Sequence, residues 1–219
     1  MTDTHSLIAP IPTTQTAIDR PPLILGIMAS GSGSNFAAVA QSIASGKLHA
    51  KIAVLIHNKS DIQAIDRARD LDIPTVFLDH REYPTRAALD RAIVSTFRAY
   101  QVECVVMAGW MRTITQVLID AFPERLINIH PSLLPSFRGL HAIEQALSAK
   151  VKITGCTVHL VSLEVDAGTI LVQAAVPVLP DDTATTLHAR VQIQEHLILP
   201  QAIDILARSR SSLVTTLDV

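Results

Sequence analysis

Net charge of either sign, long apolar runs and cysteines are all scarce in this sequence. Its 219 residues carry 18 lysines and arginines against 20 aspartates and glutamates, so a formal net charge of −2 offers no overall field to attract nucleic acid or an anionic membrane. The longest apolar runs, such as Leu23–Ala29, are far too short to span a bilayer. The 2 cysteines, Cys104 and Cys156, provide neither a disulfide framework nor a metal cluster, and each is expected to be a small apolar residue inside a strand.

The amino-terminal stretch differs from the rest of the chain. It has no basic segment followed by an apolar one, so no secretory signal is expected and the protein is predicted to be cytoplasmic. Residues 1–22 are rich in threonine and proline and lack a sustained periodicity, which predicts a flexible extension. Apolar residues make up 48% of the chain and charged residues 17%, which excludes a disordered chain and a coiled coil. Residues 23–219 are expected to form a single domain.

Short apolar runs alternate with helical patterns from residue 23 onward. Strands are expected at 23–29, 51–56, 74–78, 103–107 and 126–129, and helices near 36–45, near 61–70 and after Pro84. This alternation predicts an α/β, Rossmann-like fold with a mainly parallel sheet flanked by helices. Two segments with alternating polarity, 153–162 and 170–178, predict an antiparallel hairpin added to that sheet near the carboxyl end.

The segment Ser30-Gly-Ser-Gly-Ser-Asn35 follows the first predicted strand. A dinucleotide-binding fingerprint would need a third glycine where this chain has Phe36, and a Walker loop would need Gly-Lys-Ser/Thr. What remains is a loop of small residues before a helix, whose free backbone N–H groups suit a single phosphate. The alternative is a helix-capping turn with Ser34 or Asn35 as the cap. The residues alone favour neither interpretation.

The segment Asn128-Ile-His-Pro-Ser-Leu-Leu-Pro135 supplies a carboxamide and an imidazole. Asn128 and His130 are two residues apart in a strand, so they share a face and can donate hydrogen bonds to one developing oxyanion. His130 can also exchange a proton near neutral pH. Asp166 lies in the turn between the hairpin strands. It is either an ordinary turn aspartate or, if the hairpin folds back beside His130, the carboxylate that orients the imidazole.

Two further charged residues, Glu195 and Arg86, are expected on helices. A long helix is expected after the hairpin, with Asp181 and Asp182 as its cap and Pro200 bending or interrupting it. Glu195 falls inside the apolar stripe of this helix, and a carboxylate turned inward normally has a partner or a ligand. Arg86 is expected in the first turn of another helix, where it either meets an anion or is a solvated surface arginine.

Taken together, these motifs resemble the folate-dependent phosphoribosylglycinamide formyltransferases of purine synthesis. The resemblance runs in order from about Leu23 to Ala207. It rests on Ser30-Gly-Ser-Gly-Ser-Asn35, Ala108-Gly-Trp-Met-Arg112, Asn128-Ile-His-Pro-Ser-Leu-Leu-Pro135, Gly139-Leu-His141, Asp166-Ala-Gly168 and Arg190-Val-Gln-Ile-Gln-Glu-His196. The Asn-x-His and Asp pattern is shared by the whole formyltransferase superfamily. Thr169 departs from the family, which usually has proline there, and Trp110 stands where phenylalanine is common.

The resemblance implies transfer of a formyl group from the co-substrate 10-formyltetrahydrofolate to the amine of glycinamide ribonucleotide, without a metal. It implies a catalytic trio of Asn128, His130 and Asp166. The residues implied to bind the ribonucleotide are Gly33, Ser34, Asn35, Gln192 and Glu195. The residues implied to bind the folate are Arg86, Met111, Arg112, Thr113, Ile114, Asn128, Ser162, Leu163, Glu164, Val165 and Asp166. The expected partners are these small molecules, with no nucleic acid or membrane, and the protein is expected to be a monomer or a homodimer.

Other functions stay open at this point. A deformylase, or another formyl-transferring enzyme of the same superfamily, would use the same trio on water or on a different amine. A nucleotide- or folate-binding module without catalysis would not need the combination of Asn128, His130 and Asp166. A nicotinamide-dependent dehydrogenase is disfavoured by Phe36, which replaces the third glycine of the fingerprint.

Overall fold

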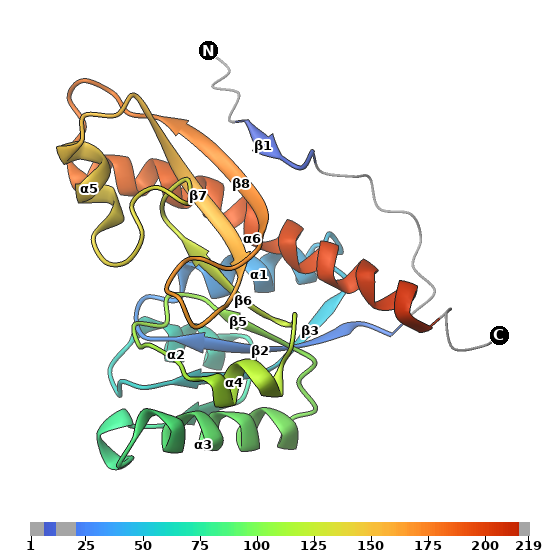
Figure 1. Cartoon of the computed structure of the whole chain (residues 1–219). Coiled ribbons are helices and arrows are strands. Elements are labelled where there is room, and N and C mark those ends of the chain that lie inside the picture. Colours follow the sequence, from blue (N-terminus) through green and yellow to red (C-terminus); the bar gives the residue numbers. More distant parts are fainter. Residues whose placement is uncertain (1–6, 12–20, 215–219) are drawn as a thin grey trace.

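One mixed sheet crosses the molecule in the computed structural model, which describes residues 7–11 and 21–214 (Figure 1). Its strand order is β1-β8-β7-β6-β5-β2-β3-β4. The strands are β1 Ile8–Ala9, β2 Leu23–Ala29, β3 Ala50–His57, β4 Thr75–Phe77, β5 Cys104–Met107, β6 Leu126–His130, β7 Ile153–Leu160 and β8 Ile170–Pro177. The strands from β2 to β6 pair in parallel, whereas β7, β8 and β1 pair antiparallel. The predicted fold, with its antiparallel carboxyl-terminal hairpin, is confirmed.

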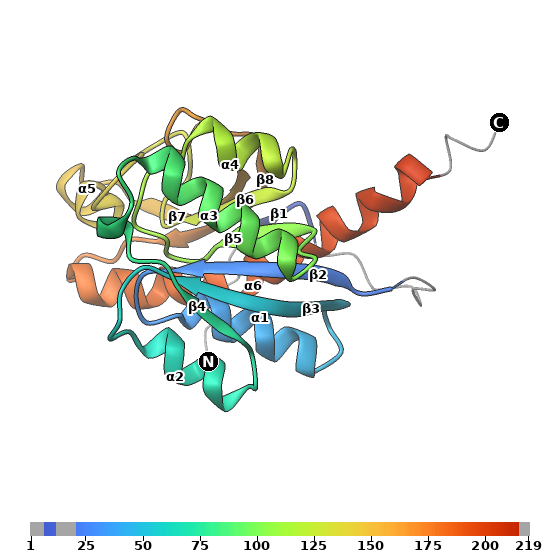
Figure 2. The same ribbon diagram turned by 90° about the horizontal axis from the view of Figure 1, so that it is seen from below.

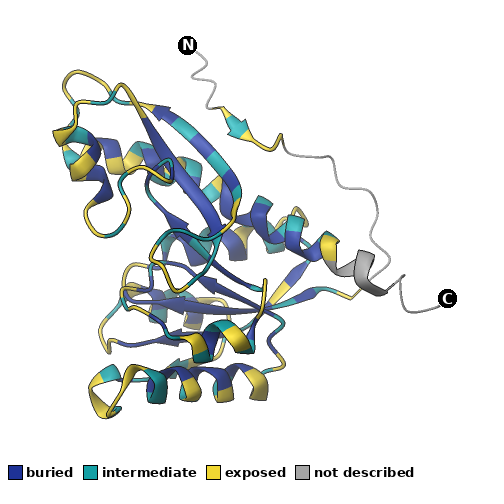
Figure 3. Ribbon diagram, in the orientation of Figure 1, coloured by how far each residue is buried: buried dark blue, intermediate teal, exposed yellow. Residues whose placement is uncertain are grey.

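Helices cover both faces of this sheet (Figure 2). They are α1 Ser34–Ala44, α2 Gln63–Asp70, α3 Arg86–Ala99, α4 Gln116–Ala121, α5 Ala142–Ser148 and α6 Ala184–Val214, with a 3-10 turn, η1, at His80–Glu82. Helices α1, α2 and α6 lie on one face, and α3 and α4 lie on the other. Each face has its own apolar core, with Val191 of α6 in one and Ile93 of α3 in the other, and the central strands β2, β5 and β6 between them are almost wholly buried (Figure 3). Burying one such side chain stabilises the fold by about 1.5–3 kcal/mol.

The chain reverses its direction across the sheet between β2 and β5. From β2 it moves outward to β3 and β4, and it then returns to β5 on the other side of β2. Open α/β sheets bind ligands at such a switch point. There the N–H of Ser30 donates to the carbonyl of Gly109 at 3.1 Å, and the N–H of Met111 donates to Ser30 Oγ at 3.0 Å. The loops that follow β2 and β5 are therefore bonded to each other.

Helix α6 differs from the prediction at its start and at its proline. Its cap is Thr183, whose Oγ1 accepts from the N–H of Thr186 at 3.2 Å, so the predicted caps Asp181 and Asp182 were wrong. Asp182 instead forms an ion pair with Arg190 at 2.6 Å, and this hydrogen-bonded partner lowers the pKa of the Asp182 carboxyl. The helix continues through Pro200 and changes direction along its length (Figure 2), as expected where a proline removes one backbone hydrogen bond.

Part of the predicted amino-terminal extension is ordered. Ile8 and Ala9 form β1 at the edge of the sheet, where the N–H of Ala175 donates to the carbonyl of Leu7 at 3.0 Å. Gln201 of α6 donates from Nε2 to the carbonyl of Pro10 at 2.7 Å. Residues 1–6 and 12–20 lie outside the described residues, so their flexibility stays a prediction. Within the part that the structure describes, no helix combines the length and the apolar character that crossing a membrane requires.

Candidate active site

Asn128 and His130 occupy the carboxyl end of β6. Ile127 and Ile129 pack into the core on the side of α6, so the alternating residues Asn128 and His130 point to the opposite face of the sheet. The His130 side chain is nearly enclosed, with 7% of it exposed. The shared face that the spacing of these two residues predicts is thus present.

Asp166 is held beside both residues by the loop that joins β7 to β8. Its Oδ2 lies 3.2 Å from His130 Nδ1, and its Oδ1 lies 3.5 Å from Asn128 Nδ2. The backbone of Asp166 has a φ of 52°, a left-handed conformation that aspartate tolerates better than most residues. Gly168 leaves no room for a side chain, because an added Cβ would lie 1.7 Å from the carbonyl oxygen of Leu160. The hairpin loop therefore folds back onto His130, as the functional interpretation of Asp166 requires.

The surroundings of Asp166 favour its ionised form. Burial alone would raise its pKa, but the hydrogen bond to His159, the Gly139 N–H at 2.8 Å and the charge of His130 outweigh burial and lower the pKa below its usual value. His130 Nε2 lies 2.8 Å from the carbonyl oxygen of Phe137, and a carbonyl can only accept a hydrogen bond. Both ring nitrogens of His130 therefore face acceptors, a geometry that a doubly protonated imidazolium satisfies.

His159 is a fourth polar member of this cluster, and no motif in the sequence predicts it. Antiparallel pairing places it directly opposite Asn128, where its Nε2 lies 3.5 Å from Asp166 Oδ1 and 3.3 Å from Asn128 Nδ2. Its Nδ1 donates to the carbonyl of Leu160 at 2.8 Å, and the side chain is 2% exposed. The alternation of β7 shows that His159 shares a face with Thr157. Only the register between β6 and β7 shows that this face adjoins Asn128.

A second polar cluster joins the start of α1 to α6. Asn35 Nδ2 donates to Glu195 Oε2 at 3.0 Å, and Gln192 Nε2 donates to Ser34 Oγ at 2.9 Å. Glu195 is buried, which raises the pKa of its carboxyl, and the hydrogen bond from Asn35 opposes this only in part. The expected inward position of Glu195 is confirmed. Four of the five residues that the resemblance implies for the ribonucleotide are thus brought together.

No side chain of the loop before α1 caps that helix. The N-cap position is Gly33, with a φ of 70°, and no side chain there accepts a hydrogen bond from the helix, so the interpretation with Ser34 or Asn35 as the cap is wrong. An added Cβ on Gly33 would lie 2.7 Å from Ala64 Cβ, because the loop packs directly on α2. Arg67 of α2 also donates from Nε to the carbonyl of Ser32 at 2.9 Å. Helix α2 therefore holds the loop in place at the amino end of α1.

The residues predicted to bind the folate are spread over three elements. Arg86 lies in the first turn of α3, as predicted, and is exposed with no hydrogen bond or ion pair to any other residue that the structure describes. In the segment after β5, Met111 and Thr113 are exposed and Ile114 is buried. Arg112 has a buried Nε without a hydrogen-bond partner among the described residues. Such a donor is available to a ligand.

The loop between β7 and β8 presents apolar side chains to solvent next to Asp166. Leu163 and Val165 are 57% and 51% exposed, and Ser162 Oγ donates to the carbonyl of Glu164 at 3.0 Å. Glu164 Oε1 lies 2.5 Å from Arg138 Nη1. This ion pair links the loop to the segment that also supplies Gly139 to Asp166.

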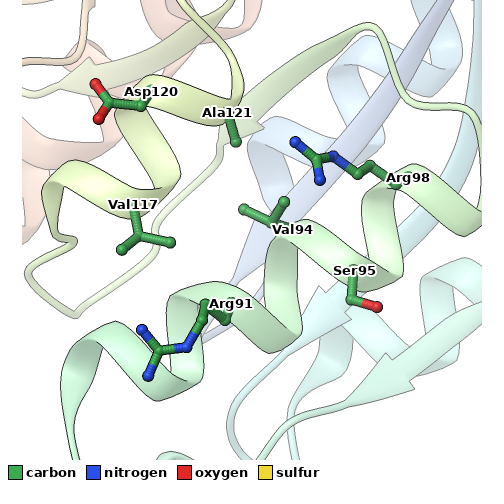
Figure 4. Close-up of a pocket in the computed structure, with 7 residues that line it drawn as sticks. All are labelled: Arg91, Val94, Ser95, Arg98, Val117, Asp120 and Ala121. Carbon is green, nitrogen blue, oxygen red and sulfur yellow. The ribbon is translucent and has the colours of Figure 1, made fainter.

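A separate shallow groove lies between α3 and α4 (Figure 4). Its volume is about 500 Å³, and its lining residues are Arg91, Val94, Ser95, Arg98, Val117, Asp120 and Ala121. None of the predicted site residues lines it. Within residues 7–11 and 21–214, no group of three or more histidine, cysteine, aspartate or glutamate side chains is arranged to hold a metal ion.

Known proteins match most of this chain. The family model described as "Formyl transferase" matches residues 25–203. A trifunctional purine biosynthetic protein adenosine-3 of Bos taurus is 42% identical over 183 residues, which cover 84% of this chain but 18% of that much longer protein. A phosphoribosylglycinamide formyltransferase of Bacillus subtilis is 38% identical over 177 residues, or 81% of this chain and 91% of that relative.

Solved structures agree with the sequence comparisons. The crystal structure of glycinamide ribonucleotide transformylase 1 from Symbiobacterium toebii superposes with a TM-score of 0.85 at 42% identity, and the match covers 86% of this chain and 89% of that one. The resemblance found in the motifs is therefore confirmed over most of the sequence. This chain belongs to the formyl transferase family.

Proposed function

We propose that this protein transfers the formyl group of 10-formyltetrahydrofolate to the amine of N1-(5-phosphoribosyl)glycinamide, a step of purine (IMP) biosynthesis. The observation that carries this proposal is the contact of Asp166 with both His130 and Asn128. Relatives that bear the name phosphoribosylglycinamide formyltransferase, from Bacillus subtilis and Escherichia coli, match over 91% and 87% of their own lengths. A cytoplasmic location and a monomeric or homodimeric state stay predictions.

In the proposed reaction, the substrate amine attacks the formyl carbon. A carbon–nitrogen bond forms, and the electron pair of the carbonyl moves onto oxygen to give a tetrahedral oxyanion. Asn128 Nδ2 and His130 donate hydrogen bonds to that oxygen, for which His130 Nε2 exchanges its present acceptor, the carbonyl of Phe137. The intermediate then collapses as the bond from carbon to N10 of the folate breaks, which leaves the formyl group on the substrate amine.

One proton must move from the attacking amine to the departing folate nitrogen. Asp166 is suited to assist it because its pKa is lowered, so its carboxylate is ionised and able to accept the proton at neutral pH. It lies against His130, whose imidazolium it stabilises while the oxyanion is present. His159 and the Gly139 N–H hold Asp166 in position.

The ribonucleotide is proposed to lie between α1 and the catalytic trio. The first backbone N–H groups of α1 have no acceptor within the helix, and together with the helix dipole they suit the phosphate. Gly33, Ser34 and Asn35 form this end of the helix, and Gln192 and Glu195 approach it from α6. A carboxylate at Glu195 suits the substrate amine or the ribose hydroxyls.

The folate is proposed to lie between the segment after β5 and the loop after β7. Met111, Leu163 and Val165 are more than half exposed and offer apolar contact to a flat ring system. Ser162 to Asp166 and Met111 to Ile114 would frame the pteridine largely through backbone groups. Arg86 and the unpartnered donor of Arg112 suit anionic or acceptor groups of the co-substrate.

An absorbance assay for consumption of 10-formyltetrahydrofolate tests the proposal directly. The purified protein is incubated with the folate in the presence and in the absence of glycinamide ribonucleotide. Turnover that requires the ribonucleotide is expected. Turnover without it would instead indicate a deformylase, and no turnover by folded protein would indicate a binding module or a different acceptor amine.

A further inference from the structure

Asp90 is a buried carboxylate on α3 that the proposed mechanism does not use. It is 2% exposed, and among the described residues its carboxylate accepts hydrogen bonds from Thr115, the residue before α4. Its Oδ2 accepts from the N–H of Thr115 at 2.6 Å and from the hydroxyl of Thr115 at 2.7 Å. Asp90 therefore fixes Thr115, the residue that immediately precedes α4 and that makes no side-chain cap bond of its own.

Thr115 directly follows the segment that is proposed to frame the pteridine. The stretch Gly109 to Ile114, which contains this segment, is fixed at its beginning by Ser30, which bonds to the carbonyl of Gly109 and to the N–H of Met111. Its far end is fixed by the two hydrogen bonds from Thr115 to Asp90. Between these anchors Met111 and Thr113 are exposed. The segment is thus a short bridge held at both ends by buried side-chain acceptors.

Asp90 also lies one helical turn after Arg86, the other residue proposed to meet the folate. Residues four positions apart on a helix lie on the same face, about 5–6 Å apart between Cβ atoms. Arg86 is exposed at the start of α3, whereas Asp90 on the next turn is buried against the start of α4. One carboxylate therefore connects the helix that carries Arg86 to the segment that carries Met111 and Arg112.

We infer that Asp90 is a positioning residue for the folate co-substrate, which sets the distance between Arg86 and the Met111–Ile114 segment. The inference rests on the proposed function. Asp90 does not touch the reacting atoms in this account. Its loss is expected to weaken folate binding, while the trio of Asn128, His130 and Asp166 and the cluster of Ser34, Asn35, Gln192 and Glu195 keep their geometry.

The test compares Asp90→Asn, Thr115→Val and Thr115→Ser by steady-state kinetics in both substrates. Asp90→Asn keeps the shape of the side chain but removes the charge that strengthens both hydrogen bonds, so the KM for 10-formyltetrahydrofolate is expected to rise about tenfold. The KM for the ribonucleotide and kcat are expected to stay within about twofold. Thr115→Val, which loses only the hydroxyl donor, is expected to show a smaller change of the same kind. Thr115→Ser, which keeps the hydroxyl, is expected to show wild-type values.

Trp110 provides a spectroscopic signal from the same segment. It is the single tryptophan of the chain, and it is 6% exposed. A red shift of its emission is expected in Asp90→Asn, because loosening the segment admits water around the indole ring. The matched control is Asp182→Asn, which removes the charge of a carboxylate that pairs with Arg190 near the start of α6, far from this segment in the sequence. It is expected to lower thermal stability without changing Trp110 emission or the KM for the folate.

The outcomes separate this inference from the proposed function. An inactive wild-type protein would contradict the proposed function itself. An active wild type with an unchanged folate KM in Asp90→Asn would overturn the positioning role. Equal rises in both KM values, or a fall in kcat that follows the loss of thermal stability, would also overturn it, because these are effects of general destabilisation.

Discussion

His130 and Asp166 are in direct contact, with Nδ1 of the imidazole 3.2 Å from Oδ2 of the carboxylate. One residue ends a parallel strand and the other lies in the loop of an antiparallel hairpin, so this contact joins the two parts of the sheet. The remaining oxygen of Asp166 faces Asn128 and His159. Asn128, His130 and His159 are therefore arranged around a single carboxylate.

Removing either partner of this contact is expected to abolish most turnover. In His130→Ala an oxyanion donor is lost, so kcat is expected to fall by about 10²–10³. Asp166→Asn is expected to cause a loss of similar size because the carboxamide cannot accept the proton. Circular dichroism and thermal melting would show that both variants fold, and wild-type rates in either variant would exclude the proposed trio.

His159 is expected to control the pH dependence of the reaction through Asp166. Its hydrogen bond helps to keep the pKa of Asp166 low, so His159→Gln weakens stabilisation of the carboxylate and raises that pKa. Asp166 then becomes protonated at a higher pH as acid is added. The acid limb of the kcat profile is expected to move to higher pH, while the rate at the plateau changes less. An unmoved acid limb would show that His159 does not act on Asp166.

Glu195→Gln is expected to stabilise the fold while it weakens activity. Burial raises the folded-state pKa of Glu195 above 4.5, so wild-type stability is lost as the pH rises through that raised pKa. Glutamine does not ionise, and its amide can donate to Asn35 Oδ1, which is buried without a partner among the described residues. One added hydrogen bond contributes about 1 kcal/mol, or about 2–4 °C in Tm for a chain of this size.

Calorimetry at several pH values checks this prediction. The difference in Tm between Glu195→Gln and the wild type is expected to be largest at neutral pH and to be smallest below pH 4.5, where the wild-type carboxyl becomes protonated in both states. A difference independent of pH would mean that ionisation of Glu195 does not cost stability. The KM for the ribonucleotide is expected to rise in the same variant.

Deleting residues 1–11 is expected to leave kcat unchanged. The segment contributes the two-residue strand β1 and the hydrogen bond from Gln201 to Pro10, both at the sheet edge formed by β8. Their loss is expected to cost about 1 kcal/mol and a few degrees of Tm. The point variant Gln201→Ala, which removes only the bond to Pro10, is the control and is expected to show a smaller loss of stability.

The sequence predicts most of the fold because the apolar pattern and the turn residues agree with each other. Runs such as Leu23–Ala29 are buried on both faces of a parallel sheet, which predicts strands and their connecting helices directly. The cap of α6 was predicted wrongly because three polar residues in a row, Asp181, Asp182 and Thr183, all suit an N-cap. In the folded chain Asp182 pairs with Arg190, and Thr183 accepts the hydrogen bond from the N–H of Thr186.

The positions of site residues were predictable where spacing along a single strand or helix determines which side a residue faces. Asn128 and His130 share a face for that reason, and Glu195 is buried for that reason. His159 was missed because its position depends on the register between two strands, which no local pattern contains. Asp90 was missed for a similar reason, since only the packing of α3 against α4 brings its carboxylate to Thr115.

The pairing of Asn35 with Glu195 and of Ser34 with Gln192 has a consequence for how the protein is made. Synthesis starts at the amino end, so Asn128, His130 and Asp166 are all translated before α6. A nascent chain at that stage contains all three residues of the proposed trio but only one half of the proposed ribonucleotide site. The last helix therefore completes the proposed ribonucleotide site, and translation that stops before α6 leaves that site without Gln192 and Glu195.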